Sequence, residues 1–267
     1  MFTAYWEMQF NPFGKPFSGR GPFESEDFKQ ATARLKHLVE IKGIGLFVGL
    51  AGSGKTFTVK AFADALNPSL YKVLYLPLST VTLREFYRAV ALGLGLSPQH
   101  KKIDLFNQIQ ERILSLSKDR RMTTVVICDE GQHLNAKILN DLKILTAFNM
   151  DSESHAAVVI SGQPALASTL SMHAHEALAQ RIVINYAFNG LAKSELPDYL
   201  GSRLKSCGVR DTMFAENAVE ALWGCCGGSP RVVNSLAEKC LLIGAQKCVR
   251  AIDPEIVMLA NGEMSLA

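Results

Sequence analysis

The chain has 267 residues, of which 48% are hydrophobic and 20% are charged, as in an ordinary globular protein and unlike a disordered or fibrous one. Its formal net charge of +3 is too small to argue for nucleic-acid binding by itself. No apolar stretch reaches the roughly 18 to 20 residues that cross a bilayer, and the N-terminus lacks the layout of a signal peptide. We therefore expect a soluble, cytoplasmic protein.

The six cysteines include no C-x-x-C pair and have no histidine at zinc-ligand spacing. Cys128 falls inside an apolar run and Cys240 on an apolar helical face, so we expect both to be small core residues. His133, His173 and His175 also lack partners at ligand spacing. The pattern does not indicate a zinc site.

Residues 1–43 precede the first predicted strand and are rich in aromatic side chains, with Asn-Pro and Gly-Pro turns between them. A helical stripe follows, formed by Phe28, Ala31, Leu35 and Leu38. Ser25 is the expected N-cap of this helix, because two acidic residues come directly after it.

A strand, a glycine-rich loop and a helix come next. The apolar run 44–48 predicts a buried strand, and the spacing of apolar residues over 56–66 predicts a helix. Between them, Gly49-Leu50-Ala51-Gly52-Ser53-Gly54-Lys55-Thr56 fits G-x-x-x-x-G-K-[ST], the phosphate-binding loop, in the context that this motif requires.

The residue types of this loop suit a bound triphosphate. Backbone N–H donors must wrap around phosphate oxygens, which calls for glycine where a Cβ would block the approach, and the next helix aims its positive end at the anion. Lys55 would neutralise phosphate oxygens, and the Thr56 hydroxyl would bind Mg²⁺. The nucleotide-binding candidates here are Gly49, Gly52, Ser53, Gly54, Lys55, Thr56 and Phe57.

The loop and the N-terminal aromatic residues each have an alternative interpretation. A glycine-rich turn with a chance lysine is the alternative for the loop, and the flanking strand and helix argue against it. For the N-terminal aromatic residues, we expect ordinary packing at the edge of the nucleotide pocket or against a neighbouring subunit, with stacking on the adenine as the alternative.

Strands and helices then alternate, which predicts a mostly parallel sheet. A strand is expected over 73–77, helices over 83–94 and 105–116, and a third strand from Thr124. That strand ends in Asp129 and Glu130. Carboxylates at the end of a buried apolar strand are costly to desolvate, so their presence indicates a function. Asp129 is the expected Mg²⁺ partner, and Glu130 is placed to orient and deprotonate an attacking water.

Two further strands each adjoin a candidate polar residue. After the strand 156–160, Gln163 is the first choice to hold the water or the γ-phosphate and Ser161 the second, with a solvated turn as the alternative. Arg181 precedes the strand 182–186. Such an arginine is usually a surface ion-pair residue, but it is also placed to act as an arginine finger on the next subunit's phosphates.

From residue 193 the pattern is purely helical and predicts a small second domain. One of its helices begins at Gly227-Gly228-Ser229-Pro230-Arg231, with Ser229 as N-cap and Pro230 in the first helical position. Arg231 then falls in a first turn that can face the nucleotide, with a solvated arginine as the alternative.

These elements, in order, resemble those of AAA+ ATPases: 49–56 resembles Walker A, 125–130 Walker B, Gln163 sensor 1, Gln180-Arg181 the arginine finger, and 227–231 sensor 2. More narrowly, Phe10-Asn11-Pro12-Phe13, the block 129–134 and Gly162-Gln163-Pro164 resemble the ExeA (general secretion pathway protein A) family. That family includes ATP-binding partners of transposases akin to IstB and TniB. The similarity covers residues 5–260, with Gly at 131 where the family usually has Ala.

The resemblance implies a P-loop NTPase fold with a five-stranded parallel sheet of order 5-1-4-3-2 and a helical lid. The expected division is an N-terminal segment with a helix (1–43), an AAA+ α/β domain (44–189) and the lid (190–267). It also implies an Mg²⁺-dependent, ATP-hydrolysing homo-oligomer in which Arg181 acts in trans and Arg231 acts from the lid.

The biological role has several candidates. Secretion members carry a transmembrane segment and a periplasmic domain after the ATPase part, and this chain ends without them, so we expect a DNA-associated helper of a transposase rather than a secretion ATPase. The alternative is a DNA-binding adaptor switched by ATP, whose phosphate contacts would be Lys101-Lys102 and 118–121. A P-loop kinase is disfavoured, because it needs neither Arg181 nor the helix that begins at Gly227.

Overall fold

The computed structural model describes residues 2–14, 21–77, 80–148, 153–209 and 213–264. Its sheet contains five strands in the order β2-β3-β4-β1-β5, and every pair of neighbours is parallel. The predicted order 5-1-4-3-2 is therefore confirmed. The strands are β1 (Ile44–Gly49), β2 (Tyr71–Leu76), β3 (Thr123–Cys128), β4 (Ala156–Gly162) and β5 (Ile182–Phe188).

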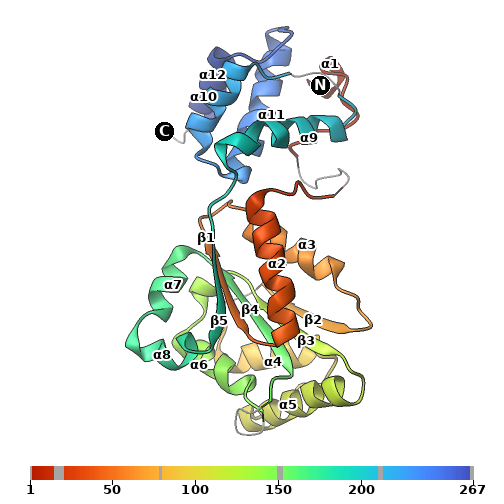
Figure 1. Cartoon of the computed structure of the whole chain (residues 1–267), viewed down its shortest axis with the longest axis vertical. Helices are drawn as coiled ribbons and strands as arrows, with labels where there is room; N and C mark the ends of the chain where they lie inside the picture. Colours follow the sequence, from red (N-terminus) through yellow and green to blue (C-terminus); the bar gives the residue numbers. More distant parts are fainter. Residues whose placement is uncertain (1, 15–20, 78–79, 149–152, 210–212, 265–267) are drawn as a thin grey trace. The chain divides into compact units, whose positions relative to one another are not determined.

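Helices connect and cover these strands (Figure 1). In and around the sheet they are α2 (Glu26–Ile41), α3 (Lys55–Ala65), α4 (Leu83–Gly93), α5 (Lys102–Lys118), η1 (Gly131–His133), α6 (Ala136–Leu145), α7 (Pro164–Leu170), η3 (His173–His175) and α8 (Glu176–Ala179). The others are α1 (Phe2–Tyr5), η4 (Lys193–Glu195), α9 (Leu196–Ser206), α10 (Glu216–Cys226), α11 (Pro230–Gln246) and α12 (Pro254–Met264).

The sheet is buried on both faces, which explains why its central strands are continuous apolar runs. Every residue of β1 and β4 is buried. On one face, Phe47, Val125 and Val159 share a core with α2 and α3. The opposite face shares a core with α4 to α8. The parallel strand order fixes which strand ends lie side by side (Figure 1).

The contacts of the chain divide it into two compact units. The α/β unit comprises Gln30–Leu50 and Lys55–Phe188, and the helical unit comprises Met1–Lys29, Ala51–Gly54 and Asn189–Ala267. The boundary between residues 29 and 30 falls within α2, and the tip of the phosphate-binding loop groups with the helical unit. The three-part division expected from the sequence stays a prediction.

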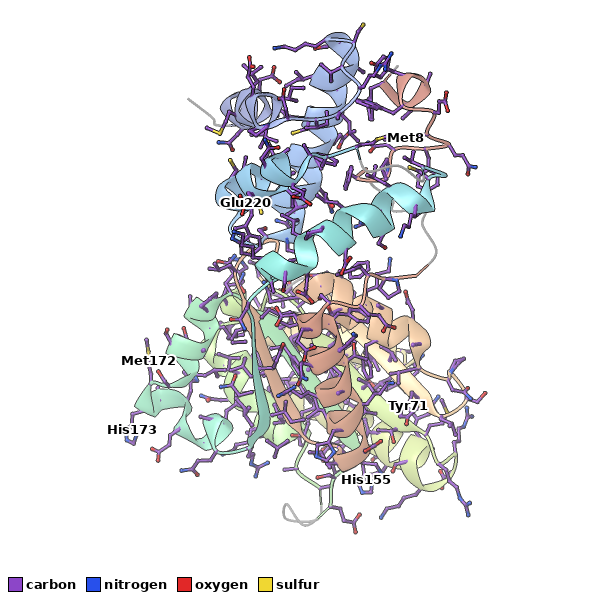
Figure 2. The ribbon with its side chains drawn as sticks, turned by 45° about the horizontal axis from the view of Figure 1, so that its top comes forward. Met8, Tyr71, His155, Met172, His173 and Glu220 are labelled. Atoms are coloured by element: carbon purple, nitrogen blue, oxygen red, sulfur yellow. The ribbon has the colours of Figure 1, made fainter. Side chains whose placement is uncertain are left out.

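N-terminal aromatic side chains pack into the core of the helical unit. Trp6 is 7% exposed and Phe13 is 5% exposed, and both join the apolar side chains of α9 to α12, as does Met8 (Figure 2). The Trp6 Nε1 donates a hydrogen bond to the carbonyl of Leu241 at 2.8 Å. Ordinary packing therefore accounts for Trp6 and Phe13, but their partners belong to the core of the helical unit, a location that the sequence did not predict.

Helix starts follow local capping chemistry. The Ser25 Oγ accepts a hydrogen bond from the Phe28 N–H at 3.2 Å, which confirms its predicted role at the start of α2. At α4, Thr82 and Glu85 form a capping box. Helices α6 and α7 were not among the elements predicted from the sequence, although Asn135 caps α6 and accepts from the Ile138 N–H at 3.0 Å. In the described part of the chain, no helix is long and apolar enough to span a membrane.

Two of the basic residues considered for DNA contact form ion pairs within the chain. The Lys102 Nζ lies 2.6 Å from Asp141 Oδ2, and the Lys118 Nζ lies 3.3 Å from Glu153 Oε2. Both lysine side chains remain more than half exposed. These pairs partly neutralise the two basic stretches and weaken the case for phosphate binding there.

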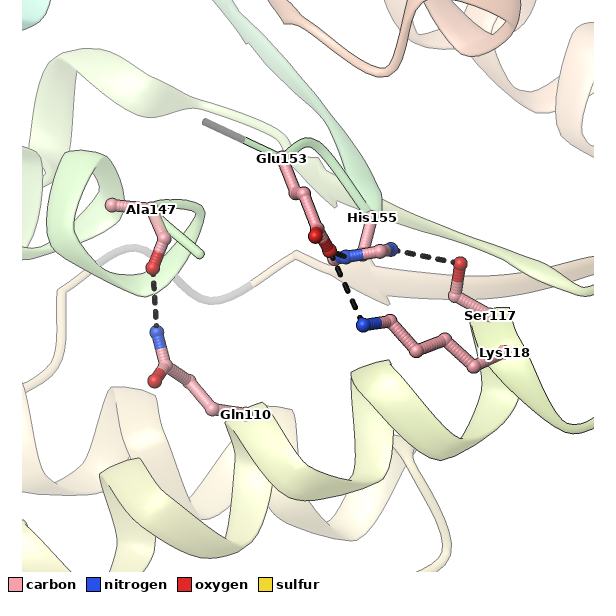
Figure 3. A network of polar contacts seen from close by, with 6 residues as sticks. All are labelled: Gln110, Ser117, Lys118, Ala147, Glu153 and His155. Atoms are coloured by element: carbon pink, nitrogen blue, oxygen red, sulfur yellow. Dashed lines mark hydrogen bonds and ion pairs between the residues drawn. The ribbon is translucent and has the colours of Figure 1, made fainter. Parts of the chain in front are cut away.

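A buried histidine links the end of α5 to the segment before β4 (Figure 3). The His155 Nδ1 lies 2.9 Å from Ser117 Oγ, and its Nε2 lies 2.7 Å from Glu153 Oε2. The Lys118 ammonium approaches the same carboxylate oxygen. The ring thus has a polar partner at each nitrogen while its side chain is only 10% exposed.

Replacing His155 by alanine should lower the free energy of unfolding by about 1–3 kcal/mol, because Ser117 and Glu153 lose their partner at a buried position. Urea unfolding measures this difference. His173→Ala is the matched control: its ring also lies 2.7 Å from a carboxylate, that of Glu176, but its side chain is 95% exposed, so no measurable change is expected. Equal effects at the two positions would contradict a structural role for the buried network.

Candidate active site

The phosphate-binding loop leaves β1 and enters α3, as the motif requires. Gly52 has φ +82° and Gly54 has φ +101°, a region that other L-residues rarely adopt. A Cβ on Gly52 would also lie 2.8 Å from both Arg231 Cβ and Ser229 Oγ. Backbone conformation and space therefore both require glycine at position 52.

Lys55 occupies the centre of the loop. Its side chain is largely buried, and its Nζ donates hydrogen bonds to the carbonyls of Gly49 at 2.7 Å and Leu50 at 2.8 Å. Ser53 is 7% exposed, and its Oγ has no hydrogen-bond partner among the described residues. A buried, unpaired hydroxyl beside a lysine ammonium and a helix N-terminus fits an anion as its missing partner.

Thr56 and Asp129 bring the two predicted segments together. The Thr56 Oγ1 donates to Asp129 Oδ2 at 2.9 Å, and the Tyr75 hydroxyl donates to the same oxygen at 3.0 Å. Burial, with the nearby charge of Asp129 adding to it, raises the pKa of Tyr75 to about 12. The phenol therefore keeps its proton at neutral pH and remains a donor to Asp129.

The donor set at this point suits magnesium. A threonine hydroxyl and a carboxylate are hard oxygen ligands, and Mg²⁺ is commonly held by one or two carboxylates together with substrate phosphates and water. The adjacent Thr56 and Asp129 oxygens supply such a set at the start of α3. No cluster of three or more His, Cys, Asp or Glu side chains suited to a metal occurs among the described residues, so an additional all-protein cage is not indicated.

Glu130 is exposed and directly follows Asp129. Its backbone is left-handed, with φ 51° and ψ 40°, which is uncommon for a residue other than glycine. The conformation turns the chain out of the sheet, and the Glu130 N–H donates to Asp129 Oδ1 at 2.9 Å. Four other non-glycine residues in the described part of the chain also have positive φ. The backbone conformation alone therefore does not identify Glu130 as a site residue; its position next to Asp129 does.

Ser161 and Gln163 differ sharply in their surroundings. Ser161 is completely buried in β4, and its Oγ has no partner among the described residues. Its register position lies next to Phe47 of β1 and one step beyond the Cys128–Ile160 pair of β3 and β4. Gln163 lies just after β4 with an exposed side chain, and its N–H donates to Gln132 Oε1 at 3.0 Å.

Gln132 is a site residue that the sequence analysis did not identify. Its Nε2 donates to Glu130 Oε2 at 2.6 Å, so its amide joins the carboxylate to the backbone beyond β4. Tyr75 was also missed. Gln132 belongs to the block 129–134, but the block does not predict this contact, and Tyr75 carries no motif. Only the folded sheet brings the two residues to Glu130 and Asp129.

The remaining candidates lie elsewhere. Arg181 directly precedes β5, at the end of the strand that lies away from the phosphate-binding loop. Its Nη1 donates to the Lys143 carbonyl at 3.1 Å. Arg231 is exposed in the first turn of α11, and its N–H lies 3.4 Å from the Gly52 carbonyl. Phe57 is 47% exposed in α3. Ser229 takes the predicted N-cap position, but its hydroxyl makes no capping bond and donates to the Gly52 carbonyl at 3.4 Å.

The other cysteines and histidines have structural explanations. Burial raises the pKa of Cys128 to about 12 and that of Cys240 to about 12, so both thiols stay protonated in the core. Figure 2 shows His173 projecting from the surface between α7 and α8, where it pairs with Glu176.

A separate groove of about 980 Å³ lies along α9 and α10 in the helical unit. Its lining includes Leu196, Leu200, Phe214 and Trp223. The residues around it include no glycine-rich loop, so it lacks the chemistry that would hold a triphosphate. The candidate active site therefore remains at Lys55, Thr56, Asp129 and Glu130.

Known proteins share sequence or fold with this chain. Residues 39–170 match the family model described as AAA domain. The chain is 28% identical to General secretion pathway protein A of Aeromonas hydrophila over 270 residues, a match that covers 99% of this chain and 49% of that protein. The chain thus spans about half the length of this curated relative.

Solved structures share the fold at lower identity. Cdc6p from Pyrobaculum aerophilum is similar with a TM-score of 0.73 and 16% identity, over 96% of this chain and 71% of that one. The ORC1 protein of Aeropyrum pernix, solved in complex with DNA, gives 0.65 and 15%, over 95% and 68%. The RuvB branch migration motor of Thermotoga maritima gives 0.60 and 16%, over 91% and 70%. The fold is that of P-loop NTPases.

Proposed function

We propose that this protein is an Mg²⁺-dependent ATPase of the AAA+ type. The observation that carries the proposal is the 2.9 Å hydrogen bond between Thr56 and Asp129. It joins the end of the phosphate-binding loop to the acidic end of β3, where Glu130 directly follows Asp129. The AAA domain match over residues 39–170 supports the same activity.

Each residue has a distinct role in the proposed reaction. Lys55 and the N–H groups of the loop hold the phosphate oxygens, and Thr56 with Asp129 holds Mg²⁺, which neutralises charge on the phosphates. Glu130 accepts a proton from a water molecule as the water oxygen bonds to the γ-phosphorus. The bond from that phosphorus to the β–γ bridging oxygen breaks, giving ADP and inorganic phosphate.

Release of phosphate from ATP by the purified chain, abolished by chelating Mg²⁺, is the direct test. Thr56→Val should lower the apparent affinity for Mg²⁺ by at least about tenfold, because a ligand and a donor to Asp129 are lost. Thr58→Val is the matched control, since Thr58 is a buried threonine of the same helix. Its metal dependence should equal that of the unmodified protein. Turnover that persists without Mg²⁺ would exclude this mechanism.

The γ-phosphate has two proposed contacts beyond the loop. Gln163 remains the first choice from the resemblance, whereas the buried and unpaired Ser161 hydroxyl gives the second choice direct structural support. We propose Arg231 as a residue that acts on the nucleotide from the lid, and Phe57 as a residue at the nucleotide's edge. Separate alanine variants, compared by ATP affinity and turnover, distinguish these assignments.

We propose a homo-oligomer for the working state, with Arg181 acting in trans. Two biological settings compete. The similarity to General secretion pathway protein A favours an ATPase linked to secretion. An ORC1 protein of the same fold was solved in complex with DNA, which favours association with DNA; a transposase as the partner rests on the resemblance of the sequence alone. Retention of an ATP-bound, slowly hydrolysing variant on duplex DNA supports the second setting, and absence of DNA binding with or without ATP favours the first.

An adaptor that uses ATP only as a switch is the alternative to a working ATPase. It would bind ATP in the same loop but show little steady turnover. The ion pairs of Lys102 and Lys118 reduce the support for its expected DNA contacts. Sustained turnover measured in the presence and absence of DNA separates the two.

A further inference from the structure

The Gln132 amide is held at both ends. It lies in η1, immediately after the acidic end of β3. Its Nε2 donates to Glu130 Oε2 at 2.6 Å, and its Oε1 accepts from the Gln163 N–H at 3.0 Å. Because an amide has one donor end and one acceptor end, these two bonds fix its orientation. A single side chain thus connects the proposed general base to the first peptide beyond β4.

The surrounding backbone leaves room for this amide only where side chains are absent. A Cβ on Gly162 would lie 2.7 Å from Gln132 Oε1, and a Cβ on Gly131 would lie 2.9 Å from Ile160 Cγ2 and 3.2 Å from the Ser161 carbonyl. Neither glycine has a positive φ. Space for the close approach of η1 to β4, rather than backbone conformation, therefore explains glycine at both positions.

Glu130 needs such a partner because its side chain is exposed. Restricting an exposed glutamate to one rotamer costs side-chain conformational entropy. Its neighbour Asp129 is already bonded to Thr56, Tyr75 and the Glu130 N–H. The contact with Gln132 restrains the carboxylate of Glu130 while leaving it able to accept a proton.

We propose that Gln132 is a positioning residue that holds Glu130 where it can accept a proton from the attacking water, and that couples the orientation of Glu130 to the end of β4. This inference rests on the proposed ATPase function. Gln132 accepts a hydrogen bond from the peptide N–H between Gly162 and Gln163. The two candidates for contact with the γ-phosphate, Ser161 and Gln163, lie next to this peptide. A shift of that peptide when phosphate binds is transmitted through the amide to the Glu130 carboxylate.

We call the path from the Gln163 N–H through the Gln132 amide to the Glu130 carboxylate the relay. Gln132→Glu, a change that keeps the size of the side chain, tests its contact with Glu130. The new carboxylate still accepts from the Gln163 N–H but cannot donate to Glu130, and its charge lies beside the general base. We expect kcat to fall at least tenfold at pH 7, with the directly titrated Kd for ATP changing less than threefold. Both changes act on Glu130 and leave the phosphate-binding loop unaltered, so a lower kcat at an unchanged Kd is the expected sign of lost positioning.

Gln163→Pro and Gln163→Ala test the second half. Gln163 has φ −78°, which a proline accommodates, and proline replaces the N–H that binds Gln132 with a ring carbon. Both variants lose the glutamine side chain, so any contribution of that side chain cancels between them. We expect kcat of the proline variant to be about tenfold below that of the alanine variant, with thermal midpoints that agree within a few degrees.

The outcomes separate this proposal from the one beneath it. Unmodified protein that releases no phosphate overturns the ATPase function and this relay with it. If the unmodified protein turns over but Gln132→Glu keeps its kcat, or the two Gln163 variants are equally active, the relay is overturned and the ATPase function stands. A lower kcat of Gln132→Glu at an unchanged Kd for ATP, together with a slower proline variant, supports the relay.

Discussion

Replacing Glu130 by glutamine should leave ATP binding intact and slow its hydrolysis by about 10²–10⁴-fold, the usual contribution of a positioned general base. Glutamine keeps the size of the side chain but cannot accept the proton of the attacking water. Phosphate release measures the chemical step, and titration with a fluorescent ATP analogue measures binding. Normal turnover in this variant would remove the assignment of Glu130.

The neighbouring carboxylate provides a matched comparison. Asp129 is buried and accepts hydrogen bonds from Thr56 and Tyr75, whereas Glu130 is exposed and contacts Gln132. Asp129→Asn should therefore weaken the Mg²⁺ dependence of binding as well as turnover, while Glu130→Gln affects turnover alone. If both variants change Mg²⁺ dependence and turnover equally, the assignment of metal binding to Asp129 and proton transfer to Glu130 is wrong.

The sheet and the residues at its strand ends were predictable because each carries a local signal. Buried parallel strands are continuous apolar runs, so 44–48 and 156–160 were recognised directly. Asp129 stood out because an acid closes such a run unfavourably. The meeting of Thr56 with Asp129 then follows from parallel topology, which gathers the carboxyl ends of strands at one edge.

The contacts that refine the site were not predictable, because they depend on how distant segments pack. Tyr75 looks like any aromatic strand residue until β2 pairs with β3, which brings its hydroxyl to Asp129. The contact between Gln132 and Gly162 was not predictable for the same reason, since it forms only where η1 packs against the end of β4. Gly131 belongs to the same close approach, since a Cβ there would lie 2.9 Å from Ile160 Cγ2.

The location of Arg181 also required the fold. Ile182 pairs with Ile44 at the start of β1, and Phe188 pairs with Gly49 at its end. Arg181 and the phosphate-binding loop therefore lie at opposite ends of a seven-residue strand, about 20 Å apart at the usual rise per residue. An arginine side chain does not span that distance, so any contact of Arg181 with nucleotide requires a second copy of the chain.

Arg181→Ala should accordingly lower ATP turnover by about 10³–10⁵-fold, the range for arginine fingers, while each subunit still binds ATP. The decisive measurement mixes this variant with Glu130→Gln. The Arg181→Ala subunit keeps a complete loop and general base, and the Glu130→Gln subunit keeps its arginine. If the arginine acts across the subunit interface, the mixture regains activity that neither variant has alone.

The structure supplies the control for this experiment. The Arg181 guanidinium donates to the Lys143 carbonyl, so alanine also removes a contact at the end of α6, and thermal unfolding of the variant shows whether the fold survives. A variant that folds normally but stays inactive in every mixture would contradict action in trans. Full activity of Arg181→Ala alone would assign the residue to surface packing, and the ATPase would then need another cation to stabilise the transferred phosphate.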